Sequence, residues 1–213
     1  MVRIIFMGVL ALAAVAALAE SININQDLLV AAREGKPDAV RALLDQGAAV
    51  NSRNRLGDTP LLMAAKNGNT PMALLVLQRG ADVNQPDVAG ISPLMAAAFN
   101  GNAELVRVLL ERKADPTPVD RVRKTAAIYA AGNGHTEVLK LLLDHGVAVN
   151  QRYANELTAL MWAAAYGHDD TVRMLLERGA DPLARDNRGK TAADMAAEGG
   201  HPATAKLLGP SAS

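Results

Sequence analysis

The sequence predicts an all-α solenoid of six stacked helix–turn–helix units with β-turns at their tips. Two observations carry this prediction: a glycine and a pair of alanines each recur every 33 residues along the 213-residue chain. The glycines are Gly35, Gly68, Gly101, Gly134, Gly167 and Gly200, and the alanine pairs are 31/32, 64/65, 97/98, 130/131, 163/164 and 196/197. A unit of this length cannot bury its apolar side alone, so each copy must stack on the next.

The copy at residues 57–84 shows why each unit forms two helices. Thr59 precedes Pro60, and the same pair recurs eleven residues later. A threonine N-cap followed by proline satisfies or removes the unpaired amides of a helix start, while Gly68 and Gly80 suit the left-handed residue that often ends a helix. We expect two helices of about eight to ten residues, too short to be stable without packing. Leucines at helical spacing form the apolar stripe of the second helix: Leu75, Leu77, Leu109, Leu110, Leu142, Leu143, Leu175 and Leu176.

The first 19 residues do not fit the repeat and are predicted to be a signal peptide that is removed. Arg3 precedes an apolar run over Ile4 to Ala17, and Ala17-Leu18-Ala19 has the small-residue pattern of a cleavage site ahead of Glu20. A retained membrane anchor is the alternative, but an anchor needs about 20 apolar residues and this run has about 15 to 16. We therefore expect export, and no membrane association after cleavage.

Residues 20–213 are then predicted to form a single repeat domain. The first copy lacks the turn signature and begins with polar residues, as expected of a cap with one solvated side, and the last copy is shortened. The junction Lys113 to Lys124 should be irregular, because Lys113 and Arg123 stand where other copies have glycine and Pro116 and Pro118 lie between them. The repeats are placed at about 24–53, 54–86, 87–119, 120–152, 153–185 and 186–209.

The motifs of these copies resemble the ankyrin repeat family over about residues 24–209. The family's TPLH-x-A signature is similar to Thr59-Pro60-Leu61-Leu62-Met63-Ala64-Ala65, and its GADVN ending stands at Gly80 to Asn84. The histidine of the signature is absent from every copy, where Leu62, Met95, Ile128, Met161 and Asp194 take its place. The resemblance implies a protein-binding module whose partner lies against the turn tips and the first helices, on the concave face.

Composition argues against several function classes. There is no cysteine, so neither disulfides nor thiolate chemistry are available. The 22 basic and 22 acidic residues balance, which gives no global reason to bind nucleic acid. No G-x-S-x-G elbow and no glycine-rich phosphate loop after a strand occurs. We therefore predict no catalytic residues, no cofactor and no enzymatic activity.

Histidine and methionine leave a metal or haem site as an alternative. His135, His168 and His201 follow the repeated glycine, where the ankyrin pattern itself has a histidine, so a structural role is favoured over metal binding. Methionines recur on the first helices. Such a row is compatible with a copper or haem site, but methionine more often fills gaps in a core. These methionines are Met63, Met95, Met161 and Met195. A metal-dependent enzyme using the histidines stays open as the lesser reading.

The positions that vary between copies predict the binding surface. The tips carry nine basic and five acidic residues, which either marks a polarised surface or is ordinary solvated charge. The aromatic residues after residue 19 are all on tips or first helices of the third to fifth copies, and arginine and aromatic side chains supply most binding hot spots. Tyr129 and Trp162 replace smaller or flexible residues and are expected to be partly core. The predicted partner-binding residues are Arg53, Arg55, Phe99, Arg121, Lys124, Arg152, Tyr153, Tyr166, Arg185 and Arg188.

Together these features predict a monomeric, non-catalytic module of the bacterial periplasm that binds an acidic or mixed protein partner. Its pattern is also similar to exported bacterial ankyrin proteins linked to periplasmic catalase and peroxide resistance, which implies a catalase or another haem enzyme as partner. The alternative is a structural or inhibitory scaffold for a cell-wall enzyme or a secreted effector.

Overall fold

A computed structural model describes residues 23–209 of the chain. The predicted signal peptide, residues 1–19, lies outside this range. The described residues form helices and turns without a β-strand, which confirms the all-α prediction. After a helical segment at residues 23–33, the elements are α2 (Pro37–Asp45), α3 (Pro60–Lys66), α4 (Thr70–Gln78), α5 (Pro93–Phe99), α6 (Ala103–Glu111), α7 (Ala126–Gly132), α8 (Thr136–Asp144), the 3₁₀ turn η1 (Ala154–Glu156), α9 (Ala159–Ala165), α10 (Asp169–Glu177), α11 (Ala192–Glu198) and α12 (Pro202–Leu208).

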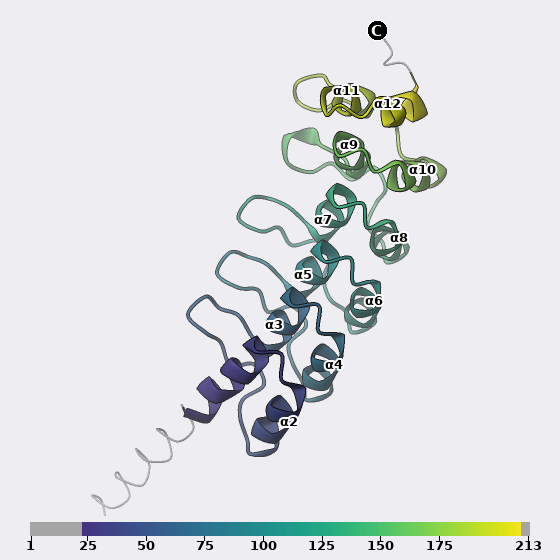
Figure 1. The fold of residues 1–213 in the computed structure, drawn as a ribbon. Coiled ribbons are helices and arrows are strands. Elements are labelled where there is room, and N and C mark those ends of the chain that lie inside the picture. Colours follow the sequence, from purple (N-terminus) through teal and green to yellow (C-terminus); the bar gives the residue numbers. More distant parts are fainter. Residues whose placement is uncertain (1–22, 210–213) are drawn as a thin grey trace, which may run out of the picture. The chain divides into compact units, whose positions relative to one another are not determined.

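The described residues fall into two compact units, 23–82 and 83–209. In the first unit α4 packs against both α2 and α3. In the second unit the first helices of successive copies, α5, α7, α9 and α11, pack side by side in one row, and α6, α8, α10 and α12 form a second row (Figure 1). In this unit the tip loops project on the side of the first helices, so the first helices and the tips share one face.

Hydroxyl side chains start the first helices as predicted. Thr59 accepts a hydrogen bond from the Leu62 amide, and equivalent bonds occur at Ser92, Thr125, Thr158 and Thr191. The prediction of Thr70 as the cap of the second helix is wrong, since α4 begins at Thr70 and Asn69 is its N-cap. The amide side chain of Asn69 accepts from the Met72 amide, which leaves Thr70 buried as the first helical residue.

The recurring alanines and leucines form the core. The alanine pairs of the first five copies are buried, as is Ala196 of the sixth, which lets neighbouring first helices approach closely, whereas Ala197 in the last copy is exposed. The methionines of the first helices are buried with them, in agreement with a packing role. On the second helices the stripe is buried except at Leu143 and Leu176, which are only half-buried. Among residues 23–209 no helix combines the length and the apolarity that crossing a membrane requires.

The tips are β-turns, and in several of them one side chain holds the turn by accepting hydrogen bonds from its backbone amides. The carboxylate of Asp87 accepts from the amides of Ala89 and Ile91, and the same pattern recurs at Asp120 and Asp186. At the junction that was expected to be irregular, Lys113 has φ of 64° and Arg123 has φ of 62°, the same left-handed conformation that the equivalent glycines take in other copies. The backbone of the repeat is therefore kept at these two positions without glycine.

An irregularity that was not predicted lies at the tip of the fifth copy. Tyr153 stands where other tips have aspartate or asparagine, so no carboxylate or amide oxygen is available there to accept the turn amides. Asn155 and Glu156 both take positive φ, of 60° and 62°, and the turn closes through main-chain bonds between Tyr153 and both Glu156 and Leu157. The loss of the acceptor thus coincides with a different turn.

Candidate protein-binding surface

Four aromatic side chains gather on the first helices of the second unit. We call Phe99, Tyr129, Trp162 and Tyr166 the aromatic row. Phe99 meets Tyr129 edge to face at 5.6 Å between ring centroids, and Trp162 stacks on Tyr166 at 6.1 Å. Gly132 of α7 lies beside the Trp162 ring, and a Cβ there would be in ordinary van der Waals contact with it at 3.5 Å. The row therefore runs across α5, α7 and α9, three neighbouring helices.

The row is partly core and partly open. Tyr129 and Trp162 are half-buried, as predicted, whereas Phe99 and Tyr166 are each 53% exposed. Aromatic rings with about half their surface in water can still bury a large apolar area against a partner. The two open rings lie at the ends of the row, on α5 and just after α9.

Lys124 joins the row from the turn before α7. Its ammonium nitrogen lies 4.6 Å from the centroid of the Trp162 ring and 5.5 Å from that of Tyr129. A cation over an aromatic face is attracted by the electron density of the ring. Lys124 is half-buried, so its side chain has less freedom to move than that of a fully exposed lysine.

Asp120 anchors the same turn through its carboxylate. It accepts a hydrogen bond from the Tyr129 hydroxyl. Burial raises the pKa of Tyr129 well above its usual value, and the hydrogen bond and charge of Asp120, with a smaller effect of Asp87, raise it further. The phenol is therefore a permanent hydrogen-bond donor in neutral solution.

Two hollows flank Trp162 and Tyr166. One of about 380 Å³ lies between α9 and α11, with Met161, Met195 and Arg188 in its lining. A smaller one of about 60 Å³ is lined from α5 and α7 by Phe99 and Tyr129 and also by Lys124. The exposed ring of Tyr166 thus stands between two depressions that side chains of a partner could fill.

Three of the predicted arginines brace their own tips. The Arg53 Nε donates to the Gly57 carbonyl at 3.2 Å, and an Arg185 guanidinium nitrogen donates to the Gly189 carbonyl at 2.8 Å. Arg152 likewise donates to a residue four positions ahead, the Glu156 carboxylate, at 3.2 Å. Their positions differ by multiples of 33 residues, a signal that could have identified this bracing role from the sequence.

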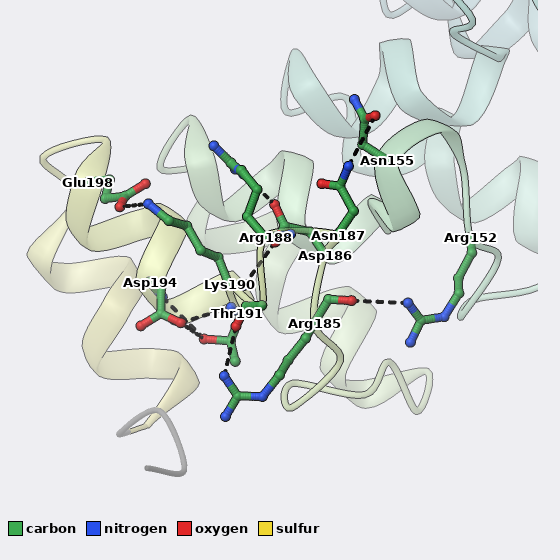
Figure 2. A network of polar contacts seen from close by, with 11 residues as sticks. Arg152, Asn155, Arg185, Asp186, Asn187, Arg188, Lys190, Thr191, Asp194 and Glu198 are labelled. Atoms are coloured by element: carbon green, nitrogen blue, oxygen red, sulfur yellow. Dashed lines mark hydrogen bonds and ion pairs between the residues drawn. The ribbon is translucent and has the colours of Figure 1, made fainter.

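Figure 2 shows how the tip of the last copy is tied together. The Arg188 Nε donates to Asp186 at 2.8 Å, and the side-chain amide of Asn187 donates to the side-chain oxygen of Asn155 at 3.5 Å. The backbone amide of Asn187 also donates to the Asn155 carbonyl, at 3.1 Å. Arg152 also reaches the Arg185 carbonyl at 3.0 Å. The tips of the fifth and sixth copies are therefore joined by direct hydrogen bonds.

The remaining predicted residues differ in availability. Arg55 and Arg121 are exposed, and neither side chain makes a hydrogen bond or ion pair with another residue of the range 23–209. Arg55 belongs to the first unit and Arg121 to the second. The structure does not bring Tyr153 into the aromatic row. Its side chain is half-buried, and this burial raises the pKa of Tyr153.

The histidines connect successive copies. The Nε2 atoms of His135 and His168 lie 2.9 Å from the carbonyl oxygens of Phe99 and Gly132 in the preceding copies. Each ring packs over the glycine of the preceding copy, as does His201. This geometry supports the structural role predicted for them. In the described part of the chain no three histidine, aspartate or glutamate side chains form a group that could hold a metal ion.

Comparison with known families agrees with this architecture. The family described as ankyrin repeats (3 copies) matches residues 28–120 and 118–186, which together cover most of the chain. The comparison with curated proteins gives no match. From the matched residues and the repeated helix pairs, we conclude that the chain belongs to the ankyrin-repeat family.

Proposed function

We propose that this protein is a non-catalytic module that binds a protein partner through the aromatic row. The observation that carries the proposal is the position of two half-exposed rings in one row on an ankyrin-repeat unit, Phe99 on α5 and Tyr166 just after α9, on either side of α7. Aromatic side chains beside pockets that a partner can fill are typical of binding hot spots. The fixed backbone of the repeats holds these rings in place before a partner arrives, which lowers the entropy lost on binding.

The chemistry around the row favours a partner with an apolar protrusion bordered by carboxylates. Lys124 sits over the row, Arg188 lines the larger hollow and exposed Arg121 lies on the tip before α7. Basic groups at the rim of an apolar centre steer acidic partners and fix their orientation. Arg55 on the first unit is proposed as a further contact on the basis of its exposure alone.

The proposed setting is the bacterial periplasm, where a catalase or another haem enzyme is the first partner to test. Support comes from the leader-like residues 1–19 and from the resemblance to exported ankyrin proteins linked to peroxide resistance. A cell-wall enzyme or a secreted effector is the alternative partner class. Fractionation of the native cells tests the setting, and recovery of the uncleaved chain from the cytosol would contradict it.

Replacement of Tyr166 by alanine tests the binding face. The change should weaken the complex by about 1–3 kcal/mol, because an aromatic anchor is lost, and should change thermal stability little since the ring is 53% exposed. Wild-type and mutant chains would be used to capture the partner from the native periplasm, and the dissociation constant of the recovered partner would then be measured for both.

Glu104→Lys is the matched control, since Glu104 is exposed on α6 in the row of second helices. It should leave the affinity unchanged. A partner that binds Tyr166→Ala as tightly as wild type, but is lost with Glu104→Lys, would place the interface on the second helices and reject the proposal.

A further inference from the structure

A cavity of about 660 Å³ lies apart from the aromatic row, between two loops of the second unit. One wall is formed by residues of the range 116–125, which lead into α7, and the other by residues 145–154, which follow α8. The volume falls within the range of small-molecule sites, about 300–1,000 Å³. No lining residue is shared with the aromatic row.

The ionisable lining of the cavity is basic. Arg123, His145 and Arg152 line it, and no aspartate or glutamate does. Arg152 is already bonded to Glu156 and to the Arg185 carbonyl. In contrast, the Arg123 side chain makes no hydrogen bond or ion pair with any residue that the structure describes between 23 and 209. The cavity thus contains a guanidinium without a carboxylate partner.

The apolar part of the lining is equally defined. Val119 and Val147 come from opposite walls, and Pro116 adds to the first of them. The half-buried side chain of Tyr153 also lines the cavity. A ligand that fits this lining needs both an anionic group and an apolar body.

The departures from the repeat converge on this cavity. Arg123 has φ of 62° at a position where Gly57, Gly90 and Gly189 stand in other copies, and a side chain in this conformation is strained. Tyr153 replaces the aspartate or asparagine of the other tips. Both positions depart from the repeat, and both residues line the cavity. Strain that is retained in this way is characteristic of functional sites.

We propose that this cavity binds a small carboxylate with an apolar body, with Arg123 as its counter-ion. The planar guanidinium pairs with a carboxylate through two parallel hydrogen bonds, and the valines contact the apolar body. The carboxylate can belong to a free organic acid or to the C-terminus of a peptide, because both present the same group. The site is independent of the partner face proposed above.

Titration of the full chain with two carboxylate probes tests this site. Octanoate represents a free acid, and the tripeptide N-acetyl-Ala-Ala-Val represents a chain terminus. Calorimetry should detect binding of at least one probe, and the probe bound more tightly identifies the source. The corresponding amides, which lack the charge, should bind about tenfold more weakly. Failure of both probes to bind, or equal binding of the amides, would overturn the proposal.

Two glycine substitutions separate binding from folding. Arg123→Gly should lower the affinity for the probe about tenfold or more. It should nevertheless raise the midpoint of thermal unfolding, because glycine adopts the observed conformation without strain. Lys113→Gly is the matched control, since Lys113 is the other basic residue with φ near 60° and does not line the cavity. It should raise the midpoint without changing binding. An equal loss of binding in both variants, or none in Arg123→Gly, would contradict a role of Arg123 as counter-ion.

Discussion

At the scale of single residues, the contact between a histidine and a glycine links one copy to the next. The His168 ring lies against Gly134 of the preceding copy and bonds to the carbonyl of Gly132. A Cβ on Gly134 would lie 2.6 Å from the Nδ1 atom of His168, closer than real atoms approach. Glycine is therefore required here for two reasons, its φ of 70° and the space that the ring occupies.

Replacement of Gly134 by alanine should therefore lower the free energy of unfolding by more than the backbone conformation alone explains. Gly200 is the control, because it occupies the same place in the last copy with φ of 78° and has nothing within 4 Å of its added Cβ. Gly200→Ala should cost about 1 kcal/mol, and Gly134→Ala about 1–3 kcal/mol more because the histidine must move. Urea denaturation measures both, and equal losses would show that the ring contact contributes nothing.

At the scale of an element, the tip at residues 185–190 depends on one carboxylate. Asp186 is buried and accepts hydrogen bonds from the amides of Arg188 and Lys190. Burial acts to raise the pKa of Asp186, but the bonds from Lys190 and Arg188 outweigh it and hold the pKa below its usual value of 3.8. Since the folded-state pKa is depressed, the stabilisation is present above pH of about 4 and is lost as pH falls through the folded pKa.

Asp186→Asn should keep the turn but lose this pH dependence. Asn54 already performs the same task in another tip, where its side-chain oxygen accepts from the amides of Leu56 and Asp58. The variant should lose less than about 1 kcal/mol at neutral pH, whereas Asp186→Ala should lose about 1–3 kcal/mol because the turn amides lose their acceptor. The free energy of unfolding would be measured for both variants between pH 3 and 7. If it fell with decreasing pH as steeply in Asp186→Asn as in the wild type, the pH dependence would not come from Asp186.

The helices were predictable from the sequence because their signals are local. Thr59 and Pro60 mark a helix start within a few residues, and burial of the alanine pairs in the first five copies follows from the period of the repeat. The cap of α4 was misplaced by one residue because Asn69 and Thr70 are both good caps, and only the folded backbone decides between them.

The binding surface was predictable only in part. The sequence indicated Phe99, Tyr153 and Tyr166, since aromatic residues on tips and first helices stand out from the repeat, and the structure places two of them, Phe99 and Tyr166, in the aromatic row. It did not indicate that Lys124 lies over Trp162, or that Arg53 and Arg185 bond to their own turns, because these contacts depend on side-chain geometry. The cavity beside Arg123 needed the paths of two loops, which no local pattern specifies.

At the scale of the whole molecule, stability and recognition both come from repetition. The helices from α2 to α12 have seven to nine residues each, too short to persist alone in water, so packing between copies holds each unit together. The balance of 22 basic and 22 acidic residues provides no long-range attraction of one sign. In the proposed function, a partner is therefore recognised by the local chemistry of one face.

Photo-crosslinking in the native cell tests this central claim most directly. A benzophenone amino acid would replace Tyr166 in the aromatic row and, in a separate chain, exposed Lys140 on α8. The account predicts a crosslinked protein partner from position 166 and none from position 140. A partner captured from position 140 but not from position 166 would contradict the account, because it would place recognition on the second helices.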